Sequence, residues 1–244
     1  MSLSDLYASL TAGAVAELSV LPICTIQTVY QTQKNLDIKV NRQSIYQITK
    51  SLYLDHGFKA FSNASLSAVT AQMVSTGSKF TLYKTLQSFG KTENGDIKNN
   101  MVNGTLSGLM SIMFTQPFDV IKNYHQRQIS IIPDLKSNKL ILYRGAKQSL
   151  SKSMILGATL YPINDKTNTY IKNPIIAAFV TSLIITPIIH PIDLLKRRAM
   201  ANEKLWLGYN PINYYRGLMI NIVRVTPHFT ITMMTINYIK KVFD

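Results

Sequence analysis

Two short stretches of the sequence place a proline, an acid and a base at helical spacing, and a third keeps only the proline. In the clearest copy, Asp193 lies two residues after Pro191, and Lys196 lies three residues after Asp193. The second copy has the same spacing and consists of Pro117, Asp119 and Lys122. Residues three apart lie on one face of a helix, and opposite charges attract strongly only where water is scarce. These stretches therefore predict ion pairs in a sheltered place.

A third copy, Pro22-Ile23-Cys24-Thr25-Ile26-Gln27, keeps the proline but has Cys24 and Gln27 where the acid and base would stand. A proline inside a helix removes one backbone hydrogen bond and favours a kink. A second marker also recurs, as Tyr143-Arg144-Gly145 and Tyr215-Arg216-Gly217. Two recurring markers predict a chain of three repeats, which we place at 1–95, 96–172 and 173–244.

Apolar residues gather in segments long enough for a membrane. A spanning helix needs roughly 20 mostly apolar residues, and 46% of the 244 residues are hydrophobic while 16% are charged. Six segments meet or approach this length, near 6–30, 64–90, 101–123, 146–171, 174–195 and 217–242. Scattered polar residues within these segments are typical of helices that have one face toward a water-filled path through the protein. We expect an all-α membrane protein with six transmembrane helices.

The net charge of +14 indicates an anionic partner, which could be a nucleic acid, a lipid headgroup or a small substrate. No nucleic-acid-binding motif is present, so we expect no nucleic-acid partner. The single cysteine, Cys24, excludes an internal disulfide. No pair of the four histidines has metal-ligand spacing, and there is no glycine-rich phosphate loop. We expect no catalytic residues, no metal and no cofactor, and therefore no enzyme.

These residues resemble the mitochondrial carrier family, in which three repeats each carry a proline motif and an aromatic-basic-glycine marker. The resemblance implies six tilted transmembrane helices with threefold pseudosymmetry around a central cavity, in the mitochondrial inner membrane. It also implies a monomer with short loop helices on the matrix side, and cardiolipin bound near Arg144, Gly145, Arg216 and Gly217. The short loops suggest a reduced member, such as one from a viral genome.

In this family the acid of each repeat pairs with the base of the next, and the pairs form a matrix gate. Carried over by motif position, Asp119 pairs with Lys196, while Asp193 faces Gln27 and Lys122 faces Cys24. We therefore expect one full ion pair of three. The resemblance places two glutamines below the network, at Gln31 and Gln126. The predicted gate consists of these residues and the three prolines: Pro22, Gln27, Gln31, Pro117, Asp119, Lys122, Gln126, Pro191, Asp193 and Lys196.

Equal offsets from Gly145, Gly217 and Ala64, which stands at the marker position of the first repeat, lead to the family's substrate contact positions near mid-membrane. These positions hold Gln72, Lys152, Ser153 and Arg224, and a charge at that depth predicts function. We also assign Glu17 to the site, either as an internal partner of Lys152 or Arg224 or as a substrate contact. Lys79 is expected to extend to the outer interface instead.

Two cations at these contacts predict an anionic small-molecule substrate. We expect a nucleotide or deoxynucleotide, moved by alternating access. A carrier for carboxylates, amino acids or another small metabolite is the alternative, as is a carrier-like membrane protein that has lost transport.

Overall fold

The computed structural model describes residues 3–33, 43–89 and 97–243, and within these ranges the chain is helical without a strand. Six helices are long enough to form the body of the protein. They are α1 (Leu3–Gln31), α4 (Ser65–Phe89), α5 (Ile97–Gln126), α7 (Ala146–Tyr170), α8 (Pro174–Met200) and α9 (Leu218–Phe243). Their positions agree with the six apolar segments expected from the sequence.

Shorter elements connect these helices. They are α2 (Ile45–His56), α3 (Lys59–Ser62), α6 (Ile132–Ser137) and two 3-10 helices, η2 (Lys139–Tyr143) and η3 (Pro211–Tyr215). Helix α2 begins with a capping box between Ser44 and Gln47, which satisfies backbone N–H groups at its start.

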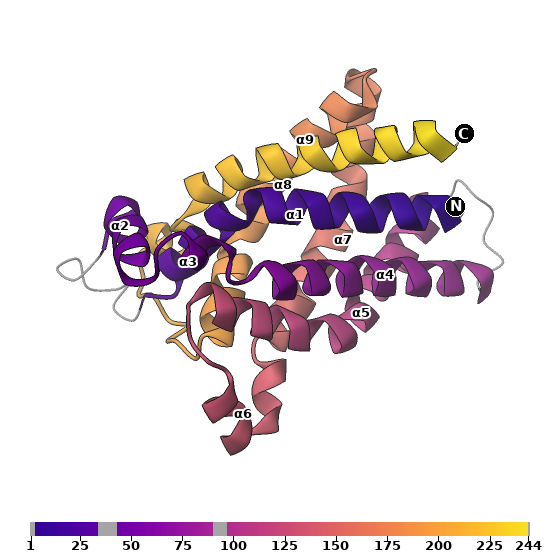
Figure 1. Ribbon diagram of the computed structural model, residues 1–244. Helices are drawn as coiled ribbons and strands as arrows, with labels where there is room; N and C mark the ends of the chain where they lie inside the picture. The colour runs from indigo at the N-terminus through magenta and orange to yellow at the C-terminus, as the bar shows by residue number, and fades with distance from the viewer. Residues whose placement is uncertain (1–2, 34–42, 90–96, 244) are drawn as a thin grey trace.

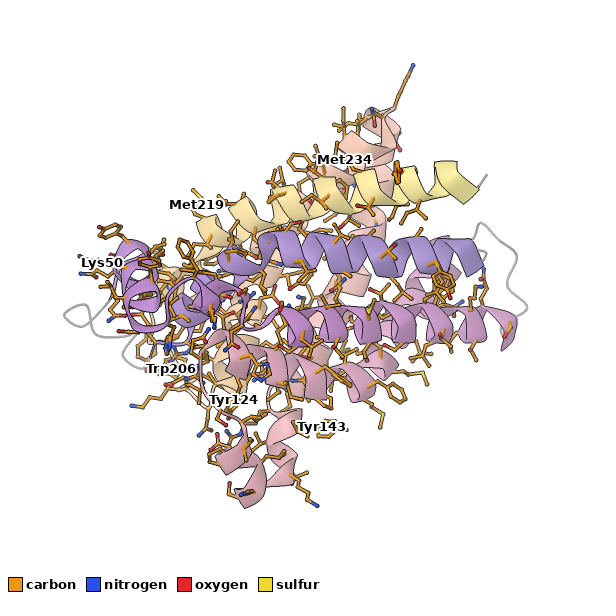
Figure 2. The ribbon with its side chains drawn as sticks, in the orientation of Figure 1. Lys50, Tyr124, Tyr143, Trp206, Met219 and Met234 are labelled. Carbon is orange, nitrogen blue, oxygen red and sulfur yellow. The ribbon has the colours of Figure 1, made fainter. Side chains whose placement is uncertain are left out.

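The six long helices form a closed ring. Each packs against the next in the order α1, α4, α5, α7, α8 and α9, and α9 returns to α1. Figure 1 shows the two termini at one end of the bundle, with α2 and α3 at the other. The side chains of Lys50, on α2, and Trp206, in the connection between α8 and α9, lie at this second end in Figure 2.

Small residues set the spacing between α5 and α7. A side-chain carbon added at Gly157 would clash with the Thr105 side chain, and one added at Gly108 would meet the Ser153 hydroxyl. Gly108 thus lies on the face of α5 that contacts α7. Membrane helices pack closely through small residues, because lipid provides no hydrophobic driving force for helix association.

The outer faces of the long helices expose large apolar side chains. Leu66 is 79% exposed, Met219 76%, Met113 69% and Met234 68%, and Figure 2 shows both Met219 and Met234 on α9. An apolar exterior of this extent indicates a membrane or a partner.

Two of the helices in the described ranges are long and apolar enough to cross a membrane, at Leu6–Gln31 and Phe179–Met200, with mean hydropathies of 1.6 and 1.4. They belong to α1 and α8. Membrane crossing by α4, α5, α7 and α9 stays a prediction.

The three proline motifs occupy equivalent places in α1, α5 and α8. Each helix continues through its motif and ends nine residues after the proline, at Gln31 after Pro22, at Gln126 after Pro117 and at Met200 after Pro191. This common end places the motif positions of all three helices at one depth, toward the end of the bundle that holds α2 and α3.

Candidate functional site: a charged cavity inside the helix ring

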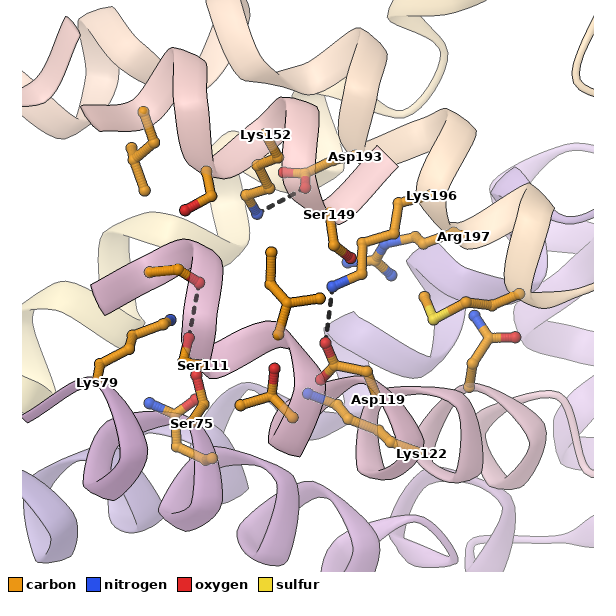
Figure 3. Close-up of a pocket in the computed structure, with 18 of the residues that line it drawn as sticks. Ser75, Lys79, Ser111, Asp119, Lys122, Ser149, Lys152, Asp193, Lys196 and Arg197 are labelled. Atoms are coloured by element: carbon orange, nitrogen blue, oxygen red, sulfur yellow. Dashed lines mark hydrogen bonds and ion pairs between the residues drawn. The ribbon is translucent and has the colours of Figure 1, made fainter. Parts of the chain in front are cut away.

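All six long helices contribute side chains to one cavity of about 430 Å³. Every residue predicted to contact substrate lies on its wall, as do the motif charges of α5 and α8. The charged residues of the wall are Glu17, Lys79, Asp119, Lys122, Lys152, Asp193, Lys196, Arg197 and Arg224. Figure 3 shows many of these side chains pointing into the space between the helices.

One ion pair joins the two intact motifs. Lys196 Nζ on α8 lies 2.7 Å from Asp119 Oδ2 on α5, as the motif positions predicted, and Figure 3 marks the contact. Both side chains are partly sheltered, with 17% of Lys196 and 28% of Asp119 exposed. Their attraction is therefore stronger than that of a surface pair.

The second motif base, Lys122, does not depend on Cys24 for a partner, which corrects the sequence prediction. Lys122 Nζ instead donates to Glu17 on α1, whose side chain is 4% exposed. Glu17 lies two helical turns before Cys24 and thus on the same face of α1. Its partner is Lys122 rather than Lys152 or Arg224, and His228 Nε2 lies 3.7 Å from its other oxygen.

The third motif acid, Asp193, also has a charged partner, although the sequence predicted that it would face only Gln27. Lys152 Nζ on α7 lies 2.6 Å from Asp193 Oδ1. Among the described side chains, the pair of Asp119 and Lys196 is the one ion pair that joins a motif acid to a motif base, as expected. The expectation that Asp193 and Lys122 lack charged partners is wrong. The ion pairs of Lys122 and Asp193 each use a cavity residue, Glu17 or Lys152, because the first motif has no charged side chain.

Three further cations on the wall form no ion pair with an acid whose side chain the structure describes. Arg224 on α9 donates twice to Asn221 Oδ1, at 3.0 and 3.2 Å, and its Nη1 lies 4.0 Å from Cys24 Sγ. Lys79 lies on the cavity wall rather than only at the outer interface. Arg197 is the third, and it closes the floor of the cavity.

Arg197 connects three helices below the ion pairs. Its Nη1 donates to Thr28 Oγ1 at 2.6 Å and its Nη2 to Gln27 Oε1 at 3.4 Å, both on α1. Thr28 Oγ1 in turn donates to Gln126 Oε1 on α5 at 2.7 Å. Gln27 and Gln126 thus take part in the hydrogen bonds that join α1, α5 and α8 at this end of the cavity. They do so through Arg197 and Thr28 and not by contacting the ion pairs. No role for Arg197 was predicted from the sequence, although Arg197 directly follows the third motif.

Arg198, which directly follows Arg197, has a structural role. It is 1% exposed, and its guanidinium donates to the backbone oxygens of Gln31, Gln33 and Lys204 at 3.2, 2.9 and 2.7 Å. The bonds to Gln31 and Gln33 satisfy carbonyls at the end of α1, which no intrahelical N–H can reach.

Beyond the end of α5, Arg127 makes a similar connection to the segment after α8. Its Nη1 donates to the Ala201 carbonyl at 3.3 Å, and its Nη2 lies 3.7 Å from Glu203 Oε1. Burial lowers the pKa of the Arg127 guanidinium, and the Glu203 carboxylate offsets part of that shift.

Gln31 does not brace the ion pairs from below. Its Nε2 donates to the Arg216 carbonyl at 3.2 Å, in the turn before α9. The Arg216 carbonyl also lies 3.0 Å from His190 Nε2, and the Arg144 carbonyl accepts from Gln116 in the equivalent turn. The residue before each of the two later motif prolines therefore contacts the arginine of its own repeat's marker.

The marker glycines permit these turns. Gly145 and Gly217 have φ of +81° and +80°, a region that favours glycine, and each directly precedes a long helix. A hollow at the start of α9 is lined by residues that include Tyr30, Ser44, Arg216 and Gly217. The predicted lipid residues Arg144, Gly145, Arg216 and Gly217 thus lie at helix starts.

The chain is similar to one protein family and to two related proteins. The profile of the family described as mitochondrial carrier protein matches residues 2–94. The chain is 36% identical to a mitochondrial carrier-like protein of Acanthamoeba polyphaga mimivirus, over 98% of this chain and 96% of that protein. It is 22% identical to mitochondrial substrate carrier family protein A of Dictyostelium discoideum, over 91% of this chain and 74% of that protein.

Proposed function

The chain belongs to the mitochondrial carrier family, and from this premise we propose that it moves an anionic solute across the mitochondrial inner membrane by alternating access. Six transmembrane helices with threefold pseudosymmetry, from repeats 1–95, 96–172 and 173–244, belong to this proposal. The closed helix ring and the common end of the three proline helices support it.

The charge balance of the cavity carries the proposal. Its described wall holds six lysines and arginines against three acids. After the three ion pairs are formed, Lys79, Arg197 and Arg224 supply positive charge from three different helices. A low-dielectric cavity with excess positive charge concentrates anions, and guanidinium groups can bind phosphate or carboxylate through two hydrogen bonds.

A nucleotide or deoxynucleotide is the substrate we favour. Its phosphates would engage Arg224 and Lys152, and Gln72 and Ser153 would offer hydrogen bonds to the rest of the molecule. The number of separate cations supports several negative charges on one substrate. Carboxylates, amino acids and other small metabolites are the alternatives.

Uptake by proteoliposomes tests this choice. Purified full-length protein is reconstituted and assayed with nucleotides, dicarboxylates, amino acids and inorganic phosphate, with protein-free liposomes as the background. We expect saturable uptake of nucleotides and its loss in Arg224→Gln. Lys147, which is exposed and lies outside the cavity on α7, provides a matched control in Lys147→Gln. Uptake of dicarboxylates alone would exclude the nucleotide proposal.

A carrier-like receptor or anchor without transport is the second candidate, and the loss of two motif charges in the first repeat favours it. The structure weakens this argument, because Glu17 and Lys152 provide charged partners for the two motif residues that lack them. Absence of uptake for every solute in the panel would favour the receptor.

We further propose that cardiolipin binds at the starts of α7 and α9, near Arg144, Gly145, Arg216 and Gly217. Free backbone N–H groups at a helix start favour phosphate. A monomer without nucleic-acid partners completes the proposal.

A further inference from the structure

The connection between α8 and α9 holds two aromatic rings away from the body of the protein. Trp206 is 63% exposed and Tyr209 is 95% exposed, and their rings meet edge to face with centroids 5.3 Å apart. Leu205 and Ile212 are exposed as well, at 40% and 73%. A single exposed apolar side chain is ordinary, but a group of them close together in the sequence forms a patch that indicates a contact surface.

Local contacts fix this connection, although its described residues form no helix before η3. The Asn213 side chain donates to the Leu207 carbonyl at 2.7 Å, and the Leu207 N–H donates to the Tyr214 hydroxyl at 3.3 Å. The Leu207 side chain is buried and packs against Leu194 of α8. The backbone is therefore held at Leu207, while the neighbouring Trp206 side chain is held outward.

The length of α8 puts the patch at the edge of a bilayer. The apolar part of α8, Phe179–Met200, has 22 residues, which extend about 33 Å in an α-helix. The hydrocarbon core of a bilayer is about 30 Å thick. A helix that crosses this core from Phe179 leaves it near Met200, and Trp206 follows soon after in the sequence. Tryptophan and tyrosine are enriched at this level of membrane proteins, because each ring joins an apolar body to a polar N–H or O–H.

The charged residues beside the patch are arranged for a lipid surface. Glu203 is drawn inward, where its carboxylate lies 3.7 Å from Arg127 Nη2 and its side chain is 11% exposed. Lys204 is exposed, and only its backbone carbonyl is used by Arg198, at 2.7 Å. An exposed ammonium can reach lipid phosphates while its aliphatic stem lies among apolar groups. The connection thus keeps its acid inside and its base outside.

The patch is continuous with the apolar outer face of α9. Ile212 lies in η3, shortly before α9 begins, and Met219 and Val223, one turn apart on α9, are 76% and 59% exposed. Figure 2 shows Trp206 at the end of the bundle that holds α2, and Met219 on α9. A soluble partner would need only the patch, whereas a bilayer covers the patch and the outer face of α9 together. This continuity favours the bilayer.

We propose that residues 204–212 anchor the protein at the membrane interface, with Trp206 and Tyr209 at the level of the phospholipid headgroups. The anchor fixes the depth at which α8 leaves the bilayer and α9 enters it. The first two connections contain the helices α2 and α6, whereas the third uses this fixed, non-helical segment. The proposal goes beyond solute transport, since it holds for any solute that the cavity binds.

Trp206 is the only tryptophan of the chain, so its fluorescence reports the position of the patch directly. Purified full-length protein is reconstituted into phosphatidylcholine liposomes without cardiolipin, in which part of the lipid carries bromine either near the headgroup or near the chain ends. We expect bromine near the headgroup to reduce Trp206 emission about twofold, bromine near the chain ends to reduce it less, and iodide on both sides of the membrane to have little effect. Quenching by iodide without quenching by brominated lipid overturns the anchor. No quenching by either, or the strongest quenching from chain-end bromine, also overturns it.

Two substitutions separate a built anchor from an incidental contact with lipid. Leu207→Ala removes the apolar contact that fixes the connection, and Tyr209→Ser removes the second ring. In both variants, iodide should quench Trp206 more, and headgroup bromine less, than in the wild type. Tyr46→Ser, which removes an exposed tyrosine from α2, is the matched control and should leave the quenching unchanged. Wild-type quenching in both Leu207→Ala and Tyr209→Ser would overturn the anchor; if Leu207→Ala does not fold, Tyr209→Ser decides. Absence of solute uptake by a protein whose Trp206 is quenched by headgroup bromine would count against the proposed function alone.

Discussion

Substitution of Glu17 by glutamine removes the carboxylate that holds Lys122, and its effect on stability can be estimated from the burial of the pair. Glu17 is 3% exposed and the Lys122 side chain 22%. Removing one partner of a fully buried pair costs about 3–5 kcal/mol, and a hydrogen bond to a charged group contributes about 1.5–3 kcal/mol. Because Lys122 keeps contact with the cavity, we expect a loss of about 2 kcal/mol.

In a chain of this length, 1 kcal/mol shifts the melting temperature by roughly 2–4 °C. We therefore expect Glu17→Gln to lower the apparent melting temperature by about 4–8 °C, measured in one detergent at one heating rate. Asp55→Asn removes an exposed acid on α2 and controls for the change in net charge.

A second substitution tests why Lys122 needs Glu17. Cys24 lies on the same face of α1 as Glu17, two turns later. It occupies the motif position at which the other two repeats have their acid. Cys24→Asp in the Glu17→Gln background should restore at least half of the lost melting temperature, because Arg224 Nη1 already lies 4.0 Å from Cys24 Sγ and Lys122 lines the same cavity. An unchanged melting temperature in Glu17→Gln, or no recovery in the double variant, would refute the reasoning.

Three further outcomes are expected. Asp119→Lys should impair uptake, and adding Lys196→Asp should partly restore it, since the pair would reform with its charges exchanged; a double variant no better than the single would show that the pairing does not support transport. Arg198→Lys should lower the apparent melting temperature nearly as far as Arg198→Gln, because one ammonium cannot replace a guanidinium bonded to three carbonyls; full recovery by lysine would contradict the capping role. Gly157→Ala should separate α5 from α7 and so reduce the yield of folded protein. Gly77→Ala, whose added carbon would meet only one side-chain atom at 4.0 Å, should be neutral or stabilising. Size-exclusion profiles of the two variants would show the difference.

The six long helices and the pair between Asp119 and Lys196 could be predicted because each depends on local pattern or on two intact motifs. Apolar segment length predicts the helices, and the family's pairing of each motif acid with the base of the next repeat predicts the contact between Asp119 and Lys196. The family resemblance supplied the ring and its cavity.

The partners of Lys122 and Asp193 could not be predicted from motif position. The sequence shows that Cys24 and Gln27 lack charge, but not which residue replaces them. That choice depends on the reach of long side chains across the cavity, as with Lys152. Helical periodicity did contain one signal, since Glu17 lies on the same face of α1 as Cys24. The roles of Arg197 and Arg198 required the contact between α8 and α1, which no local pattern contains.

The contact between α9 and α1 has a consequence for how the protein is made. The last helix closes the ring against the first, and Arg198 near the end of α8 bonds the backbone of Gln31 and Gln33. During synthesis, the face of α1 that packs against α9 therefore stays uncovered until nearly the entire chain is made, although Glu17 can pair with Lys122 once α5 is present. Such distant contacts form slowly. Biogenesis should thus depend on protection of the first helix until α9 arrives, and loss of α9 should prevent assembly of the whole cavity rather than of one wall.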